Sequence, residues 1–404
     1  MKRILLASTI LLALVSCKRE APRQTESFLM EFRMPQECLS SARYKNKTVV
    51  LKGTDSYEYV TDVAGMVSVE GIVPGIYDII TNWEMTGADY KTLLKEDNPA
   101  IDDKARVIIG ATLTGERIFA ARDFEIDLSA AIVRGLMISK VYYAGTKDAS
   151  GKNYDTDSYV EIFNNSDETM YLDGLYLGLA DNDNPAKYVA QDHPDSIYMR
   201  QICRFPGNGT TVPVQPGEGI VIAAQSAQNH LDNGAQSSVD LSNARFEVKD
   251  MEGKGNPDVP MLEIIHTSWP TVKTLNLNRG TDNSVLLFEA DEADYASWPL
   301  IYPVAGSTEV FKRIPKTAVL DGVECLKNNV SGGPNANDKR LPKDVDAGYQ
   351  YINSVSGLNH ESVERKVSRY ENNRYYLTDT NNSTADFAVC TDPTPGKYDK
   401  EGLL

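Results

Sequence analysis

Short apolar and aromatic runs, separated by Gly, Pro, Asn and Asp, recur along the chain from residue 28 onwards. Runs of about four to eight residues with this composition predict β-strands, and the Gly- and Pro-containing gaps between them predict turns. Between residue 28 and about residue 130 the pattern predicts a small β-sandwich, with 85–104 as a connecting loop. Its predicted strands are Phe28–Met34, Thr48–Lys52, Tyr57–Thr61, Met66–Val69, Ile76–Thr81, Ala105–Ile118 and Phe124–Leu128.

A second series of runs extends from about residue 134 to residue 397 and predicts a larger β-domain. In the polar turn after its second strand, Asn164, Asn165 and Ser166 are expected to close a corner through hydrogen bonds to the backbone. Gly174 is expected to allow a bulge or a positive φ between two halves of the third strand. The first three predicted strands are Leu136–Tyr143, Tyr159–Phe163 and Met170–Leu177. The sequence thus predicts an all-β protein with two β-sandwich domains.

The first 17 residues have the layout of an export signal. Lys2 and Arg3 precede the apolar stretch Ile4–Val15, which is too short to span a bilayer as a stable helix. The stretch ends in Leu-Val-Ser-Cys17, which resembles the bacterial lipobox, so we expect Cys17 to be acylated and to become the new amino terminus. The polar residues 18–27 are interpreted as a short tether.

A lipid anchor at Cys17 places the protein on a membrane without a spanning helix, because buried acyl chains hold a soluble domain there. The expected location is the outer membrane. Surface-exposed lipoproteins of Bacteroidota often carry an acidic run after the cysteine, whereas Lys18-Arg19-Glu20 stands here. The periplasmic and the surface face of that membrane therefore both stay open.

The segment Thr61–Tyr77 resembles the central hairpin of transthyretin-like, carboxypeptidase-regulatory-type modules. It carries their pattern T-D-x-x-G-x-[VFY]-x-[VF]-x-G-[IL]-x-P-G-x-Y. Such modules are usually spacers or accessory domains without catalytic residues. The resemblance therefore implies a transthyretin-like, non-catalytic domain at 28–130.

The segment Tyr159–Leu177 resembles the core of the lamin-tail domain, an immunoglobulin-like β-sandwich. Pro216–Ala223 resembles the next turn and strand of that family. A plain lamin-tail domain is much shorter than 134–397, so stretches near 182–212 and 250–350 are expected to be insertions. The segments that resemble its closing part are Ser362–Lys366, Asp379–Ser383, Asp386–Phe387 and Pro393–Gly396.

Together, the lipobox, the transthyretin-like module and the enlarged lamin-tail module resemble a family of Bacteroidota lipoproteins. No established activity comes with this resemblance. The family resemblance therefore implies an architecture and a compartment, and leaves the ligand open.

The charge of the chain excludes one class of partner. Its 404 residues include 57 acidic and 41 basic side chains, which give a formal net charge of −16. Because such a surface repels a phosphate backbone, we expect no nucleic-acid partner. There is no CxxC pair, and an oxidising compartment allows one disulfide among Cys203, Cys325 and Cys390, with the pairing undetermined.

The sequence offers no catalytic motif. It has no G-x-S-x-G elbow, and its four histidines, His193, His230, His266 and His360, fall in unrelated loops. Arg365 is expected to form a buried ion pair with Asp379 and Asp386 that holds the terminal strand. We therefore expect the protein not to be an enzyme.

The remaining candidates are ligand contacts and modification sites. Trp269, Trp298, Tyr143 and Tyr176 are candidate ligand-binding aromatics, although strands favour tyrosine for structural reasons as well. Asp181, Asp183 and Asp192 are candidate calcium ligands, with solvated acidic loops as the alternative, so no cofactor is expected unless calcium is bound. Ser196, in Asp-Ser-Ile, matches a short O-glycosylation motif of Bacteroidota envelope proteins, and is equally well read as a loop residue.

These expectations favour a lipid-anchored cell-envelope binding or structural protein. It would present β-sandwich loops to a protein or glycan partner and contact the membrane through its acyl anchor, without catalysis. The alternative is a ligand-capture lipoprotein accessory to a TonB-dependent outer-membrane transporter.

Overall fold

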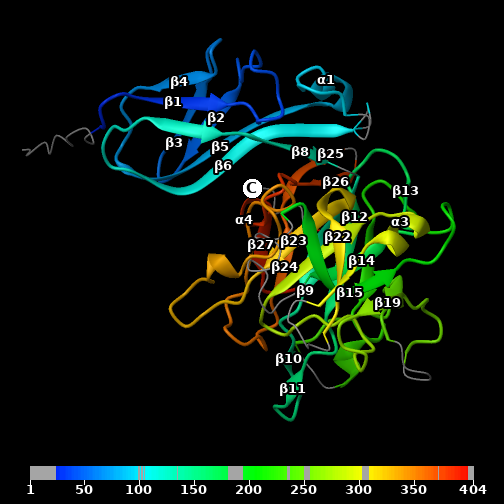
Figure 1. The fold of residues 1–404 in the computed structure, drawn as a ribbon. Coiled ribbons are helices and arrows are strands. Elements are labelled where there is room, and N and C mark those ends of the chain that lie inside the picture. The colour runs from blue at the N-terminus through cyan, green and yellow to red at the C-terminus, as the bar shows by residue number, and fades with distance from the viewer. Residues whose placement is uncertain are drawn as a thin grey trace, which may run out of the picture. The chain divides into compact units, whose positions relative to one another are not determined.

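The fold is that of a computed structural model, in which the chain divides into two compact units (Figure 1). One unit consists of Met1–Trp83 and Gly110–Leu128, and the other of Glu84–Ile109 and Ser129–Leu404. The residues that the structure describes are 24–98, 101, 103, 105–133, 135–180, 194–233, 237–249, 255–302, 309–371 and 373–398.

The first unit is a β-sandwich in which inward and outward side chains alternate along several of the strands. In β1, for example, Phe28, Met30 and Phe32 are buried, as the two-residue period of a strand requires. One sheet has the order β4-β1-β7, and the other contains β3-β2-β5-β6. The strands are β1 (Phe28–Arg33), β2 (Thr48–Lys52), β3 (Ser56–Val60), β4 (Met66–Val69), β5 (Gly75–Thr86), β6 (Arg106–Ile118) and β7 (Phe124–Asp127).

The expectation of a loop throughout 85–104 was wrong at its start. Strand β5 continues to Thr86, and helix α1 (Gly87–Lys91) follows it directly. The Thr86 hydroxyl accepts a hydrogen bond from the Asp89 backbone N–H at 3.1 Å, which caps the first turn of the helix. This Thr-x-x-Asp spacing signals the start of a helix, and a search for strand periodicity alone does not detect it.

The second unit is a larger β-sandwich made of two sheets. The first sheet has the order β18-β17-β12-β9-β24-β27, and the second has the order β21-β22-β15-β14-β20-β23, with β19 paired to β15. Apolar residues from both sheets, such as Ile138, Val160, Leu177 and Val285, form one buried core between them. The all-β class and the β-sandwich architecture predicted from the sequence are therefore confirmed.

Most strands of the second unit are short. The strands are β8 (Ser129–Val133), β9 (Leu136–Tyr142), β10 (Thr146–Lys147), β11 (Asn153–Tyr154), β12 (Tyr159–Asn164), β13 (Met170–Tyr171), β14 (Tyr176–Ala180), β15 (Ser196–Arg204), β16 (Pro213–Val214), β17 (Gly219–Ala223), β18 (Phe246–Glu247), β19 (Glu263–Thr267), β20 (Asn283–Phe288), β21 (Leu300–Ile301), β22 (Phe311–Pro315), β23 (Val319–Cys325), β24 (Ser362–Arg365), β25 (Val367–Glu371), β26 (Arg374–Leu377) and β27 (Phe387–Cys390). The helical segments are η1 (His230–Asn233), α3 (Glu292–Ser297), η2 (Lys316–Ala318), η3 (Ala336–Asp338) and α4 (Ser383–Asp386).

The corner after β12 forms as the sequence predicts. Asn164 Nδ2 donates to the carbonyl oxygens of Glu168 and Val214, both at 2.8 Å, and Asn164 Oδ1 accepts from the Ser166 backbone N–H at 2.9 Å. Gly174 has a φ of +72° and separates β13 from β14, which the sequence combined into one strand. The corner residues are thus scaffold residues, whose side chains replace missing backbone partners.

The stretches expected to be insertions relative to a plain lamin-tail domain contribute strands to the second sheet. Strand β15 lies between β14 and β22 in the second sheet, and all its residues from Ile197 to Cys203 are buried. The polar residues of β15 hide this strand from a search for apolar runs. One of them, Arg200, has a fully buried side chain that donates from Nε to the Ala180 carbonyl at 3.1 Å. A buried, hydrogen-bonded arginine in mid-strand breaks the apolar pattern without breaking the strand.

The glutamate of the Tyr-Val-Glu-Ile segment holds the C-terminal residues on the first sheet. Glu161 is fully buried on β12, where Oε2 accepts from the Gly396 backbone N–H at 2.7 Å and Oε1 accepts from the Tyr398 hydroxyl. On the adjacent strand β9, the buried Lys140 Nζ donates to the Thr394 carbonyl oxygen at 2.8 Å. Lys140 Nζ also donates to the Lys397 carbonyl oxygen, so the two side chains fasten the segment 394–398 at four points.

We expect Glu161→Ala to release this segment. Trypsin cleavage after the exposed Lys397 should become at least about tenfold faster, because a hydrogen bond to a charged group contributes about 1.5–3 kcal/mol. Limited digestion followed by mass spectrometry measures the rate. Glu218→Ala is the matched control, since Glu218 binds the Gln215 N–H in a local turn. Equal rates in both variants would contradict the role assigned to Glu161.

Candidate functional site

Two of the four candidate aromatics, Tyr176 and Trp298, lie in one cluster on the outer face of the second sheet. Tyr176 stacks between Phe288 and Tyr295, with ring centroids 5.1 Å apart on each side, and Trp298 lies 5.9 Å from Tyr295. Tyr176 is only 1% exposed, so it cannot be the exposed ligand contact that the sequence suggested. The reason is that helix α3 carries Tyr295 over the strand face.

The other two candidate aromatics lie apart from this cluster. Tyr143 is fully buried at the end of β9, which corrects the expectation of an exposed ring. Trp269 is half-buried, and its indole Nε1 donates to Glu309 Oε1 at 3.0 Å while the Arg200 guanidinium lies over its ring. The four rings therefore form no common aromatic platform.

Several predicted site residues lie outside the described residues, namely Cys17, Asp181, Asp183 and Asp192. Ser196 is the first residue of β15 and half-buried, so it is not the plain loop residue that the sequence left open. Among the residues that the structure describes, no group of three or more His, Cys, Asp and Glu side chains could hold a metal ion.

The described cysteines of the second unit are not cross-linked. Cys203, Cys325 and Cys390 are free thiols, and burial raises the pKa of each. The disulfide that the sequence allowed is therefore not formed among them.

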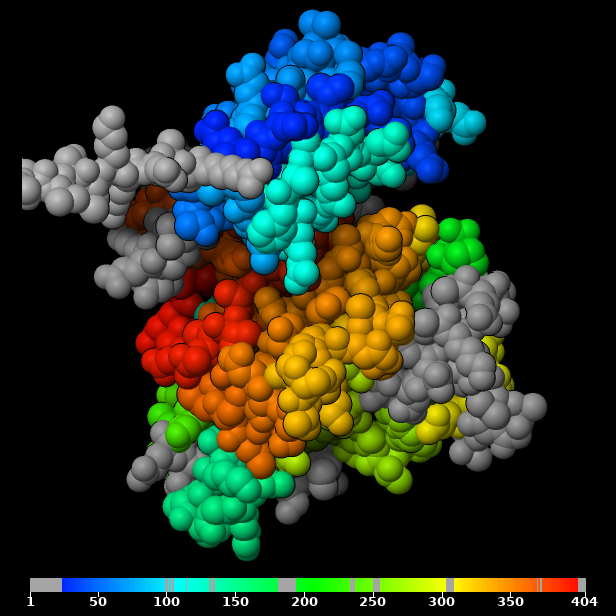
Figure 2. Space-filling view, turned by 90° about the vertical axis from the view of Figure 1, so that its left-hand side faces the viewer, coloured from blue at the N-terminus to red at the C-terminus, as the bar shows by residue number. Residues whose placement is uncertain are grey.

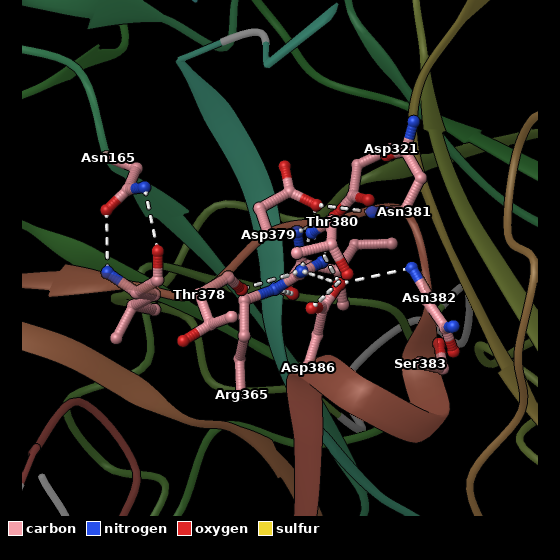
Figure 3. Close-up of polar contacts among 12 residues, drawn as sticks. Asn165, Asp321, Arg365, Thr378, Asp379, Thr380, Asn381, Asn382, Ser383 and Asp386 are labelled. Atoms are coloured by element: carbon pink, nitrogen blue, oxygen red, sulfur yellow. Dashed lines mark hydrogen bonds and ion pairs between the residues drawn. The ribbon is translucent and has the colours of Figure 1, made fainter. Parts of the chain in front are cut away.

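The predicted ion pair of Arg365 exists and is larger than expected (Figure 3). The guanidinium contacts Asp379 at 3.1 Å and Asp386 at 3.4 Å through Nη1, and Asp321 at 2.9 Å through Nη2. Its Nε donates to the Ile138 carbonyl at 3.0 Å. Asp321 lies on β23 of the opposite sheet, a position that the sequence did not connect with Arg365.

The electrostatics of this network are those of a buried structural centre. Burial raises the pKa of Asp321 to about 7 and of Asp386 to about 6, although Arg365 opposes both shifts. Burial also opposes the charge on Arg365, but the surrounding carboxylates outweigh it and raise the pKa of the guanidinium. All four side chains are almost inaccessible to solvent, so the network joins strands and offers no surface for a ligand.

Arg365→Met should lower the free energy of unfolding by about 3–5 kcal/mol at pH 7.5, because it leaves buried carboxylates without their counter-charge. The loss should be smaller at pH 5, where Asp321 and Asp386 are largely neutral. Urea unfolding followed by tryptophan fluorescence measures it. In the control Arg204→Met, which removes only the pair with the exposed Glu292, we expect a loss below about 1 kcal/mol. Similar losses in both variants would refute this assignment.

A second polar cluster, which the sequence did not predict, joins four segments of the second unit. Asp157 Oδ2 accepts hydrogen bonds from the Ser238 hydroxyl at 2.6 Å and from the Tyr142 hydroxyl at 3.0 Å. The Tyr142 oxygen lies 3.4 Å from His360 Nδ1. Tyr142, Asp157 and Ser238 are buried, and His360 is half-buried. We refer to these four residues as the Asp157 cluster.

The backbone beside the Asp157 cluster is strained. Gly357, Leu358 and His360 have φ values of +76°, +62° and +56°. Left-handed φ is uncommon for residues other than glycine and is costly for a bulky side chain such as leucine. Strain of this kind persists only where surrounding contacts enforce it, and it concentrates at functional sites.

Unpartnered polar atoms gather in the same region. Asp157 Oδ1, the Tyr159 hydroxyl and Asn359 Oδ1 are buried and have no hydrogen-bond partner among the described residues. Buried polar atoms are rarely left unpaired, because the desolvation cost of about 1–3 kcal/mol is then not recovered. The coincidence of strain and unpaired polar atoms marks this region as the candidate functional site.

The region belongs to one end of the second sandwich, which we call the hairpin end. Strand β9 ends at Tyr142, opposite the start of β12 and of β24, and β20 starts at Asn283 opposite the end of β23. The loops of both sheets are joined there, since the Gly280 N–H before β20 donates to the Tyr143 carbonyl after β9 at 3.2 Å. The loop segments of the hairpin end are 143–158, 224–233, 237–241, 278–282, 326–335 and 351–361.

The hairpin end also presents apolar side chains to solvent. Leu231, Val330 and Val355, each on a different loop, are 44%, 93% and 37% exposed. The β10–β11 hairpin forms the lowest part of the second unit in Figures 1 and 2. Its Tyr154 hydroxyl contacts His230 Nδ1 of η1 at 2.7 Å, which fixes the base of the hairpin to the neighbouring loop.

Among the described residues no helix has the length and apolar character needed to cross a membrane.

Comparison with known proteins relates the chain to one family. Residues 215–394 match the sequence profile of a family described as a protein of unknown function (DUF4876). The fold is similar to the crystal structure of a DUF4876 family protein from Bacteroides thetaiotaomicron, with 25% sequence identity, a TM-score of 0.58, and coverage of 91% of this chain and 96% of that chain. None of the curated proteins matches the chain.

A DUF3823 family protein from Bacteroides ovatus matches more weakly. It has 11% sequence identity and a TM-score of 0.14, and the match covers 49% of this chain and 98% of that chain. A TM-score this low carries no structural argument.

Proposed function

Taking the chain as a β-rich relative of the DUF4876 proteins, we propose that it is a lipid-anchored protein of the cell envelope that binds a partner through its hairpin end. The observation that carries the proposal is the convergence at this end of exposed apolar side chains, strained backbone and unpaired polar atoms. Loops at the end of a rigid sandwich are where this architecture commonly places its binding residues.

The finer architecture is part of the same proposal. The first sandwich is a transthyretin-like spacer, and the second is an enlarged lamin-tail-like domain of a Bacteroidota lipoprotein. The lipobox ending in Cys17 supports attachment to the outer membrane, and a spacer between anchor and binding loops suits a partner that lies away from the lipid surface.

The arrangement of the Asp157 cluster favours binding over catalysis. The Ser238 hydroxyl donates to a carboxylate instead of to a histidine, so it lacks the serine–histidine pair by which hydrolases commonly activate a nucleophile. The His360 ring contacts Tyr142 and not the serine. The cluster therefore resembles a joint between loops more than a catalytic group.

Replacement of the lipobox cysteine tests the anchor. Cys17→Ala should move the protein from the membrane fraction to the soluble envelope fraction, because the acyl chains that hold it would no longer be attached. Fractionation followed by immunoblotting measures the distribution. Retention of the variant on the membrane would contradict lipid anchoring.

A pair of matched substitutions tests the binding end. Leu231→Asp should reduce recovery of a stoichiometric partner from detergent-solubilised membranes by at least about tenfold, because it places a charge on the proposed contact surface. Leu300→Asp should leave recovery unchanged, since Leu300 is also half-exposed but lies on the edge strand β21.

Equal recovery with both variants would contradict binding through the hairpin end. If the recovered partner is a TonB-dependent transporter, the proposal narrows to a ligand-capture lipoprotein. Circular dichroism of both variants should confirm that they remain folded.

A further inference from the structure

One carboxylate connects two loop segments and the end of a strand at the hairpin end. Asp157 precedes β12, and its Oδ2 receives one hydrogen bond from Tyr142 at the end of β9 and another from Ser238 in segment 237–241. These donors lie 15 and 81 residues away in the sequence. His360 connects the strained segment 357–360 to the same tyrosine. Segment 237–241 is therefore held to β9 through a side chain that can exist with or without a charge.

We propose that the Asp157 cluster is a proton-sensitive latch, closed when Asp157 is neutral and weakened when Asp157 is ionised. The proposal concerns how firmly the loops are held and needs no ligand, so it can fail or succeed independently of the proposed binding function.

The geometry explains why the charge on Asp157 is costly. The side chain is fully buried and is solvated by two hydroxyl groups and the backbone N–H of Asp157 itself, while Oδ1 has no partner among the described residues. Among the described residues no cationic side chain pairs with this carboxylate, and the Arg279 guanidinium binds Asp155 at 2.6 Å. Ionisation therefore places an incompletely solvated negative charge at the joint.

The direction of the effect follows from the pKa values. Burial raises the pKa of Asp157 to about 6, against the hydrogen bonds from Ser238 and Tyr142, so the neutral form stabilises the closed latch. This stabilisation is complete below the ordinary pKa of about 4 and is lost as the pH rises through 6.

The titration of His360 changes the stability of the closed latch with pH in the opposite direction. Burial lowers its pKa, with Asp392 opposing, so its contribution is lost as the pH falls below about 6.5. Other charged or titratable groups around the cluster are the neighbouring Asp155, Tyr159, whose ring centroid lies 5.6 Å from that of Tyr142, the hydrogen-bonded pair of Tyr154 with His230, and Asp240 close to His230.

The strained segment makes the latch able to open locally. Leu358 and His360 keep left-handed φ values while their N–H groups bind the Ala144 and Gly145 carbonyl oxygens at 2.7 and 3.1 Å. Because strain lowers the free energy of local opening, a modest change at Tyr142 and Asp157 is enough to shift the population of the open form.

Hydrogen exchange of the full chain at pH 5.0 and 7.5, corrected for intrinsic rates, tests the latch. The variant His360→Asn removes the opposing titration and keeps the backbone, since asparagine tolerates left-handed φ. In this variant the opening constant of peptides covering 237–241 should be about tenfold higher at pH 7.5 than at pH 5.0, given pKa values of about 4 when open and about 6 when closed. The wild-type chain should show a smaller ratio.

Two further variants make the test specific. Asp157→Asn added to His360→Asn should abolish the pH dependence, because asparagine keeps an oxygen for Ser238 and Tyr142 but cannot ionise. Ser238→Ala should move the transition to higher pH, because it removes a donor that lowers the pKa of Asp157.

The matched control is Asp173→Asn. Asp173 also holds a loop, through the N–H groups of Asn208 and Val212 among others, but hydrogen bonds from Thr211 and its neighbours lower its pKa despite burial. It is charged at both pH values, so loss of its hydrogen bonds should loosen residues 208–212 equally at each. A pH ratio within twofold of unity in His360→Asn, or one that persists when Asp157→Asn is added, would overturn the latch.

Discussion

The buried guanidinium of Arg365 is the interaction on which the second sandwich most depends. It lies on β24 of one sheet, contacts Asp321 on β23 of the other, and binds the Ile138 carbonyl of β9. Through Asp379 and Asp386 it also fixes the chain between β26 and β27. Hydrophobic contacts between two sheets tolerate sliding, whereas a fork of hydrogen bonds does not. The network therefore sets the register of the sheets and the course of the last strand.

The acidic composition has a structural use beyond surface charge. Carboxylates on or beside strands bind the backbone N–H groups of long loops: Glu324 binds those of Arg340 and Leu341, each at 2.7 Å, and Glu361 binds that of Asn353. The long connection between β23 and β24 has few backbone partners of its own, and a buried N–H without a partner raises the free energy of the folded state. Some of the acidic side chains thus accept hydrogen bonds from loop N–H groups that, in a strand, would be bonded to a neighbouring strand.

The sequence predicted what depends on local pattern. The strands of the first unit, the Asn164 corner and the pairing of Arg365 with Asp379 and Asp386 follow from periodicity, turn chemistry and short separations. It missed what depends on distant segments. Asp321 lies 44 residues from Arg365, and Ser238 lies 81 residues from Asp157, so no spacing signals either contact. Tyr176 was assigned to the surface because nothing in β14 indicates that α3 covers it.

Two physical quantities, burial and the number of hydrogen-bond donors, separate the permanent anchors from the candidate switch. Asp173 receives hydrogen bonds from four backbone N–H groups, those of Asn208, Gly209, Thr211 and Val212, and from the Thr211 hydroxyl, so its charge is well solvated and its pKa falls. Asp157 is fully buried, receives hydrogen bonds from two side-chain hydroxyl groups and leaves one oxygen unpaired, and its pKa rises. The same residue type in the same role thus becomes a fixed charge or a titratable one according to its burial and to how many donors the fold supplies. The strained segment 357–360 lies beside the poorly solvated carboxylate. Gain or loss of the Asp157 proton therefore takes place next to backbone that is already strained.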